Sequence, residues 1–164
     1  MCALSSLLHV MAAFAWLLQQ AAAEPLPRLG ADLSRTPVSG ISSGGYMAVQ
    51  FHIAHSATVI GAGVLAAGPY YCAQGSVWTA VYNCMKPGMW TPLPALVLLE
   101  TDTSVLARSG QIDATDNLKR AWLFTGKREE TVRPIVVEAL KRYYECYVPP
   151  PPLRTSTGST RGMP

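Results

Sequence analysis

The chain has 164 residues, of which 49% are hydrophobic and only 14% are charged. This length suits one domain, and so high an apolar content can form a core, which argues against a disordered chain. The net charge of +3 is too small, and its basic residues are too scattered, to indicate a nucleic-acid-binding protein. No apolar run reaches the ~18 residues of a transmembrane helix, which excludes a protein that crosses a membrane several times.

The N-terminal segment has the composition of a signal peptide. Residues 1–23 contain no Asp, Glu, Lys or Arg, and an apolar run from Leu7 to Leu18 is broken only by His9. Three alanines at 21–23 then fit a small-residue cleavage site. We therefore predict cleavage after residue 23, a secreted (extracellular or periplasmic) protein and no membrane association afterwards. The alternatives are a buried N-terminal helix or a single membrane anchor.

The remaining chain divides into a linker over 24–35, a domain over 36–148 and a Pro-rich tail over 149–164. Hydrophobic spacing predicts the following elements in chain order: a helix over 46–57, a buried strand over 59–67, a short helix over 76–82, a helix or strand over 96–106, a short strand over 121–124 and a helix over 131–147. The four prolines at 149–152 and the Ser/Thr/Gly/Arg residues after them predict an extended or disordered tail.

Cysteine usage has a different meaning in a secreted chain, because oxidising compartments favour disulfides. Cys72 and Cys84 are 12 positions apart across Gly75 and could close a small loop. The alternative is two free, buried thiols. Cys146 has no evident partner, and no cysteine spacing is typical of zinc, so we expect neither a metal nor a cofactor.

One motif indicates chemistry. Gly40, Ser42 and Gly44 fit the G-x-S-x-G pattern of a nucleophile elbow, in which a sharp strand-to-helix turn exposes the serine hydroxyl and glycines allow strand and helix to approach. Ser42 is therefore the candidate nucleophile, and the amide of Ser43 is the candidate donor to an oxyanion at the helix N-terminus. The alternative is a Gly/Ser turn without chemistry.

A serine nucleophile needs a base, and the two histidines outside the predicted signal peptide are poorly placed for this role. His52 and His55 lie in the helix that Ser42 is predicted to open. Ten helical residues span about 15 Å, whereas a hydrogen bond reaches about 3 Å. We therefore predict that both are ordinary helix side chains.

Several stretches resemble secreted poly(3-hydroxybutyrate) depolymerases and related esterases. They are residues 38–52 (VSGISSGGYMAVQFH), 61–64, 67–72, 84–85 and 123–144. The resemblance covers roughly 36–148 and implies an α/β-hydrolase fold with an incomplete sheet flanked by helices. In one branch of this family the elbow lies near the mature N-terminus, as a circular permutation, which matches the position of Ser42.

The resemblance also assigns the partners of the serine. The acid of the family's catalytic triad follows a Leu-Phe-x-Gly strand end, where this chain has Glu129 with Glu130 beside it. The alternative for both glutamates is a solvated helix N-terminus, where acidic residues are favoured. The family's triad histidine comes later, in a Gly-His segment, but this chain has no histidine after His55. The resemblance ends at about Val148, which leads us to expect a C-terminally truncated domain.

The function implied by the resemblance is that of a secreted serine esterase. It would hydrolyse a short-chain polyester, its oligomers or a related ester by acyl transfer through Ser42, with the polyester or small ester as its partner and no nucleic acid. The alternative is an inactive remnant without a triad histidine that at most binds a ligand. A shortened sheet would expose an edge and part of its core, which predicts poor solubility.

The aromatic residues complete the predictions. Trp78, Trp90 and Trp122 could line a substrate cleft, but core packing is expected for at least two of them. The last helix carries its tyrosines on an apolar face, so they are predicted to form core and rim; they are Tyr143, Tyr144 and Tyr147.

Overall fold

The computed structural model describes residue 27, residues 30–148 and residues 153–158. Residues 1–31 and 32–164 form two separate units, and the fold below is that of the second. The predicted signal peptide and the prolines at 149–152 lie outside the described residues. Among the described residues, no helix is both long and apolar enough to cross a membrane.

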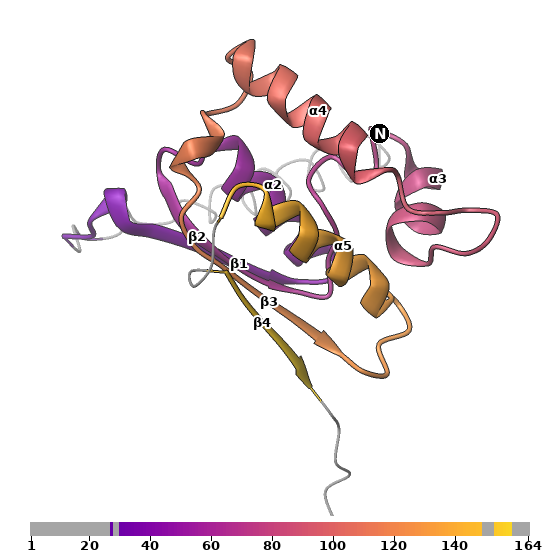
Figure 1. The fold of residues 1–164 in the computed structure, drawn as a ribbon. Coiled ribbons are helices and arrows are strands. Elements are labelled where there is room, and N and C mark those ends of the chain that lie inside the picture. Colours follow the sequence, from indigo (N-terminus) through magenta and orange to yellow (C-terminus); the bar gives the residue numbers. More distant parts are fainter. Residues whose placement is uncertain (1–26, 28–29, 149–152, 159–164) are drawn as a thin grey trace, which may run out of the picture. The chain divides into compact units, whose positions relative to one another are not determined.

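The second unit contains a four-stranded parallel sheet with strand order β1-β2-β3-β4 (Figure 1). The strands are β1 (Thr36–Ile41), β2 (Val59–Leu65), β3 (Ala121–Gly126) and β4 (Leu153–Gly158). The main helices are α2 (Ser43–Ala54), α4 (Leu96–Arg108) and α5 (Pro134–Glu145). Shorter elements are η1 (Leu33–Arg35), α3 (Val77–Thr79), the π-helical η2 (Ala80–Met85) and η3 (Thr115–Asn117).

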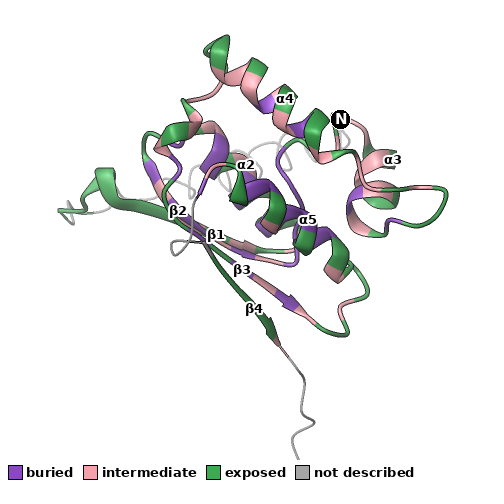
Figure 2. Cartoon of the chain, in the orientation of Figure 1, coloured by how far each residue is buried: buried purple, intermediate pink, exposed green. Residues whose placement is uncertain are grey.

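The helices α2 and α5 cover one face of the sheet (Figure 1). Consecutive parallel strands joined by right-handed crossovers place their helices on the same side, and this sheet follows that rule. Fully buried side chains from both helices meet the inward-facing residues of the central strands; they are Val49, Ile53, Leu140, Tyr144, Val64 and Leu123. Figure 2 shows the buried residues along the inner sides of α2 and α5. The resulting arrangement is that of an incomplete α/β fold.

The predicted elements are largely present, with shifted ends. The first helix begins at Ser43 rather than Tyr46, directly after the candidate nucleophile. The segment 96–106, left open between helix and strand, is helical. The last helix begins at Pro134, because a proline has no N–H to lose in the first turn and its fixed φ suits that position.

Part of the tail, which is predicted to be extended or disordered, forms a strand. Residues 153–158 form β4, which pairs in parallel with β3, with Phe124 opposite Ser156. Of the two alternatives, the extended one holds for these residues. The outer edge of β3 would otherwise leave backbone N–H and C=O groups unpaired, and the Thr and Ser residues of this segment tolerate an extended backbone.

The aromatic predictions have opposite outcomes. Tyr143 and Tyr144 are fully buried, as expected for core residues. The expectation that at least two of the three tryptophans pack in the core is wrong, because Trp78, Trp90 and Trp122 are 65%, 90% and 40% exposed. Their positions explain this: Trp78 lies on a short surface helix, Trp90 lies in a proline-bounded loop, and Trp122 lies on the sheet face opposite α5.

Candidate active site

Ser42 lies at the turn between β1 and α2 and has the backbone geometry of a nucleophile elbow. Its φ is 55° and its ψ is −124°, a combination that is strained for a residue with a side chain. The Ser42 N–H donates a hydrogen bond of 3.0 Å to the carbonyl oxygen of Leu65 at the end of β2. This bond fixes the turn to the neighbouring strand, so the strained conformation is held by the sheet.

Two glycines make the turn possible, and one of them is outside the five-residue motif. A Cβ on Gly40 would lie 2.2 Å from the carbonyl oxygen of Gly44, and a Cβ on Gly45 would lie 2.7 Å from that of Leu65. A Cβ on Gly44 would meet nothing within 4 Å. The prediction that both motif glycines allow the strand and the helix to approach closely is therefore right for Gly40 and wrong for Gly44. Gly45, and not Gly44, is the second glycine that the close approach requires.

The N-terminus of α2 presents backbone donors beside the serine. The first hydrogen bond of the helix runs from the Tyr46 N–H to the Ser42 carbonyl oxygen, so the N–H groups of Ser43 and Gly44 precede the helical ladder. The helix has 12 residues, and its dipole adds positive potential at this end. The amide of Ser43 therefore lies where a donor to an oxyanion is expected.

A pocket of about 390 Å³ opens next to Ser42 and Ser43. Its other walls come from the first half of α2, the loop over 71–75 and η2; the lining residues are Tyr46, Gln50, Tyr71, Cys72, Ala73, Gln74, Gly75, Ala80, Cys84 and Met85. None of these residues is charged, so the pocket suits a neutral group with apolar carbons better than an ion.

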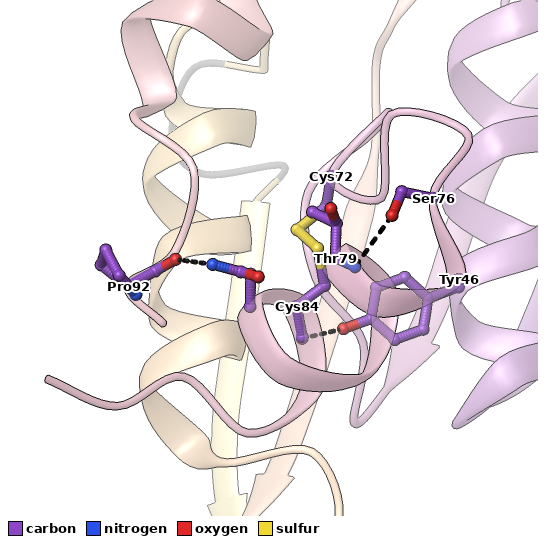
Figure 3. The surroundings of a disulfide bond; sticks show 7 residues. Tyr46, Cys72, Ser76, Thr79, Cys84 and Pro92 are labelled. Atoms are coloured by element: carbon purple, nitrogen blue, oxygen red, sulfur yellow. Dashed lines mark hydrogen bonds between the residues drawn. A yellow bond between two sulfur atoms is a disulfide. The ribbon is translucent and has the colours of Figure 1, made fainter. Parts of the chain in front are cut away.

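The predicted disulfide lies in the wall of the pocket. Cys72 and Cys84 are bonded, with Cα atoms 6.0 Å apart, and both are buried (Figure 3). The bond joins the loop after β2 to η2, and the amide of Thr79 donates to the Ser76 side chain at the start of the intervening helix. Closing this short loop stabilises the native wall by roughly 3 kcal/mol on the chain-entropy estimate.

Tyr46 connects this wall to the nucleophile helix, a role that sequence reasoning missed. Its hydroxyl donates a hydrogen bond to the carbonyl oxygen of Cys84 (Figure 3). Burial raises the pKa of Tyr46 above its ordinary value, so the hydroxyl keeps its proton and remains a donor. The sequence shows only a tyrosine one turn after Ser43; its partner, 38 positions away, depends on the fold.

The loop that borders the pocket has a strained backbone. Tyr71 and Gln74 have φ values of 56° and 48°, in the left-handed region that favours glycine. Successive turns connect Pro69 to Cys72 and Tyr71 to Gln74 through backbone hydrogen bonds. Strain of this kind persists only where the surroundings impose it, and it is concentrated at functional sites.

Glu129, the candidate acid, lies in the loop between β3 and α5. Its Oε1 accepts hydrogen bonds from the backbone N–H groups of Thr131 at 2.8 Å and Val132 at 3.2 Å. The helix begins only at Pro134, so Glu129 orders the preceding loop and does not lie in the first helical turn. Glu130 is exposed. Because β1 and β3 are parallel, Ser42 and Glu129 lie at the same edge of the sheet.

The two histidines of α2 lie away from this edge. His52 is completely buried, and its Nδ1 is 2.9 Å from the hydroxyl of Tyr144. Its Nε2 has no hydrogen-bond partner among the described residues. Burial lowers the pKa of His52 from 6.5 to about 4, so the imidazole is neutral near pH 7. His55 is exposed at the C-terminal end of the helix, about 15 Å or more from Ser42 on helical geometry.

The described residues contain no group of His, Cys, Asp and Glu side chains arranged to hold a metal ion. Cys146 is a free, exposed thiol whose Sγ lies 3.3 Å from Oε1 of Glu100. Although Cys146 is exposed, partial desolvation of the thiol and the neighbouring glutamates raise its pKa to about 11, which keeps it in the unreactive thiol form.

The chain is similar to known depolymerases over most of its length. It is 45% identical over 131 residues to a poly(3-hydroxybutyrate) depolymerase of Delftia acidovorans, an alignment that covers 78% of this chain and 26% of that protein. It is 36% identical over 135 residues to a polyhydroxybutyrate depolymerase of Talaromyces funiculosus, covering 77% of this chain and 37% of the relative. No model of a protein family matches the chain.

Solved structures give the same result. The crystal structure of PHB depolymerase from Penicillium funiculosum superposes with a TM-score of 0.69 at 28% identity, covering 82% of this chain and 41% of that one. A second structure with the same values contains a serine-to-alanine variant of a PHB depolymerase complexed with an R3HB trimer. The chain thus spans between about a quarter and two fifths of the length of these relatives.

Fold and elbow together define an α/β-hydrolase, in which a parallel sheet carries a strained serine between a strand and a helix N-terminus. Within this class, the chain is similar in sequence and structure to poly(3-hydroxybutyrate) depolymerases. The resemblance and the fold class expected from the sequence are both confirmed.

Proposed function

We propose that this chain carries the acyl-transfer half of a secreted serine esterase that acts on short-chain polyesters or their oligomers. The single observation that supports this best is the strained backbone of Ser42 at the mouth of an uncharged pocket. The relatives are named as depolymerases of poly(3-hydroxybutyrate), and one solved relative contains an R3HB trimer. A disulfide beside the pocket supports secretion, since such bonds persist in oxidising compartments.

In the proposed reaction, the Oγ of Ser42 attacks the ester carbonyl carbon and its proton passes to a base. The carbonyl π electrons move to the oxygen, which accepts a hydrogen bond from the amide of Ser43. Collapse of this tetrahedral species expels the alcohol, which takes up the proton, and leaves an acyl-serine ester. Water then cleaves that ester, releasing the acid and restoring the serine hydroxyl.

None of the described residues is placed to act as the base for Ser42. His52 is buried against Tyr144, and His55 lies at the other end of α2, so neither imidazole can take the proton of Ser42. Glu129 is proposed as the acid that would orient an imidazole at this edge, and the hydrogen bonds that its Oε1 accepts from two backbone amides fix the position of its side chain. A positioned general base contributes about 10²- to 10⁴-fold to such a rate.

A second candidate function follows from this placement of the histidines. The chain would then be a catalytically inactive, ligand-binding protein that retains the elbow and pocket. The observation that favours it is the burial of His52 together with the distance of His55 from Ser42. The two candidates differ in one measurable property, the nucleophilicity of Ser42.

The deciding experiment measures turnover of p-nitrophenyl butyrate and labelling by a fluorophosphonate, each with and without added imidazole. We expect slow labelling of the wild-type chain, faster turnover when imidazole is added, and neither effect in Ser42→Ala. Imidazole would act as the base that the described residues do not provide. Ser109→Ala, which changes an exposed serine at the end of α4, is the matched control and should behave as wild type.

The result that removes the esterase proposal is equal background turnover in the wild type and Ser42→Ala at every imidazole concentration. In that case, binding of an R3HB trimer measured by calorimetry would support the ligand-binding alternative. Absence of both turnover and binding would contradict both candidates.

A further inference from the structure

The residues of α2 that line the pocket beside Ser42 form one stripe along the helix. They are Ser43, Tyr46 and Gln50, which lie three and four positions apart and therefore share one side of the helix. Gln50 comes eight positions after Ser42, which is about 12 Å along the helix axis. The pocket thus extends away from the nucleophile along α2, and Gln50 is its most distant residue on this helix.

Gln50 brings a side-chain amide with unused hydrogen-bonding capacity to this stripe. Among the described residues, hydrogen bonds engage the side-chain amides of Asn83 and Gln111 but not that of Gln50. The Tyr46 hydroxyl, by contrast, is occupied, because it donates to the Cys84 carbonyl oxygen on the opposite wall (Figure 3). Gln50 is half-buried. A ligand that fills the pocket would therefore meet its amide as a free donor and acceptor.

The separation of Ser42 and Gln50 matches the repeat of the proposed substrate class. A 3-hydroxyacyl polyester repeats every four backbone bonds, which extend over roughly 5 Å at ordinary bond lengths, so two repeats span about 10 Å. Helical side chains tilt toward the helix N-terminus, so the amide of Gln50 reaches back toward Ser42 and shortens the separation of the two groups. An ester carbonyl two repeats from the reacting one would then lie beside Gln50.

We propose that Gln50 is a specificity-determining residue whose Nε2 donates a hydrogen bond to the ester carbonyl oxygen two repeats from the reacting carbonyl. Inside a polyester chain every polar atom is an acceptor, so an amide N–H is the matching group. The other walls of the pocket are uncharged and accommodate the methyl and methylene groups of the repeats. The substrate class rests on the proposed function. The inference adds that the pocket selects at least three repeats with carbonyls at this spacing.

Selection of this kind depends on the cost of leaving an amide unpaired. A plain alkyl ester would cover Gln50 with methylene groups and remove water from its amide without replacing the hydrogen bond. A site that bonds a polar group therefore rejects an analogue without that group more strongly than an apolar pocket rejects an additional methylene. Because Gln50 is only half-buried, we expect a preference of about fivefold or more rather than the larger ratios of fully buried sites.

The test measures binding, so its result does not depend on whether Ser42 is reactive. The full chain with Ser42→Ala is titrated by calorimetry with a 3-hydroxybutyrate trimer that is capped as a methyl ether and a methyl ester. Two comparison ligands have CH₂ in place of the first or the third carbonyl. We expect one of them to bind at least about fivefold more weakly than the trimer, through loss of the bond to Gln50.

Variants of the glutamine assign this loss. In Gln50→Leu, added to Ser42→Ala, the trimer and that comparison ligand should bind equally. Gln50→Glu keeps the size of the side chain, but its carboxylate only accepts hydrogen bonds, so it should also lose the preference. Gln111→Leu changes an exposed glutamine beyond the end of α4 and is the matched control, which should keep the preference.

A second measurement leaves Gln50 in place. The NMR signal of its side-chain amide, assigned by its absence from the spectrum of Gln50→Leu, should shift when the trimer is added and shift less with the weaker comparison ligand. The proposal is overturned by equal binding of all three ligands, by a preference that persists in Gln50→Leu or Gln50→Glu, by an unshifted amide signal, or by no binding of the trimer.

The outcomes separate this inference from the proposed function. If Ser42 proves unreactive but the preference that depends on Gln50 is present, the esterase proposal fails and the role of Gln50 stands. If esters are turned over through Ser42 without that preference, the esterase proposal stands and the role of Gln50 is excluded.

Discussion

The buried imidazole of His52 predicts a specific loss of stability in acid. In the folded chain its Nδ1 contacts the hydroxyl of Tyr144, and its Nε2 has no partner among the described residues. Protonation would add an N–H without an acceptor in the interior, so the charged form is disfavoured and the pKa falls to about 4. The unfolded chain protonates the same group near its ordinary pKa of about 6.5.

The sign and size of the effect follow from this difference. Because the folded-state pKa is lower, the unfolded chain binds more protons between pH 6.5 and about 4. Stability from neutral His52 is therefore complete above pH 6.5, decreases as the pH falls through this window, and changes little below it. The loss amounts to about 3 kcal/mol, a large part of the stability of a small domain.

Urea unfolding at a series of pH values measures this loss directly. We compare wild type with His52→Gln, which cannot protonate but can still bond to Tyr144, and with His55→Gln, which changes the exposed histidine of the same helix. The wild type and His55→Gln should lose about 3 kcal/mol more than His52→Gln between pH 7 and pH 4. If the free energy of unfolding changes with pH in parallel for wild type and His52→Gln, the reasoning is refuted.

Two further predictions concern the walls of the pocket. Replacing Cys72 and Cys84 by alanine should lower the free energy of unfolding by roughly 3 kcal/mol and loosen the loop over 70–85, measured by urea unfolding and hydrogen exchange; unchanged stability would contradict the assigned role. Gly45→Ala should lower the free energy of unfolding by about 1–3 kcal/mol, because its Cβ would lie 2.7 Å from the Leu65 carbonyl oxygen. Gly44→Ala should leave the stability nearly unchanged, because its Cβ would meet no atom within 4 Å. Equal thermal midpoints for the two glycine variants would show that the close approach at Gly45 is not required.

Local patterns were sufficient to predict the elements around the elbow. The three- and four-residue spacing over 46–57 and the β-branched run after it are confirmed by α2 and β2. They succeed because each element packs one side against a single core, which imposes a regular period on the sequence. The spacing of Cys72 and Cys84 likewise left a disulfide open as one of two alternatives, and the structure forms it.

The exposed tryptophans show where such patterns fail. The strand over 121–126 reads Ala-Trp-Leu-Phe-Thr-Gly, which is apolar on both sides and is typical of a strand buried on both faces. Periodicity cannot reveal that helices cover only the side of Leu123 and leave Trp122 exposed, because that depends on which other segments are present. The contacts of Tyr46 and Gly45 were missed for a related reason: their partners come from η2 and β2, far away in sequence.

The sheet topology also restricts how any base can reach the serine. Ser42 follows β1 and Glu129 follows β3, with β2 between them, so their strands are separated by about 10 Å. An imidazole that contacts both must enter over the carboxyl end of β2, beside the pocket that the disulfide lines. The carboxyl end of β4 lies at the same edge, but residues 159–164 contain no histidine. Any imidazole, whatever its source, would therefore have to enter by this one route. For this reason, if added imidazole restores ester turnover only when both Ser42 and Glu129 are present, the carboxyl end of the sheet retains the geometry of a hydrolase.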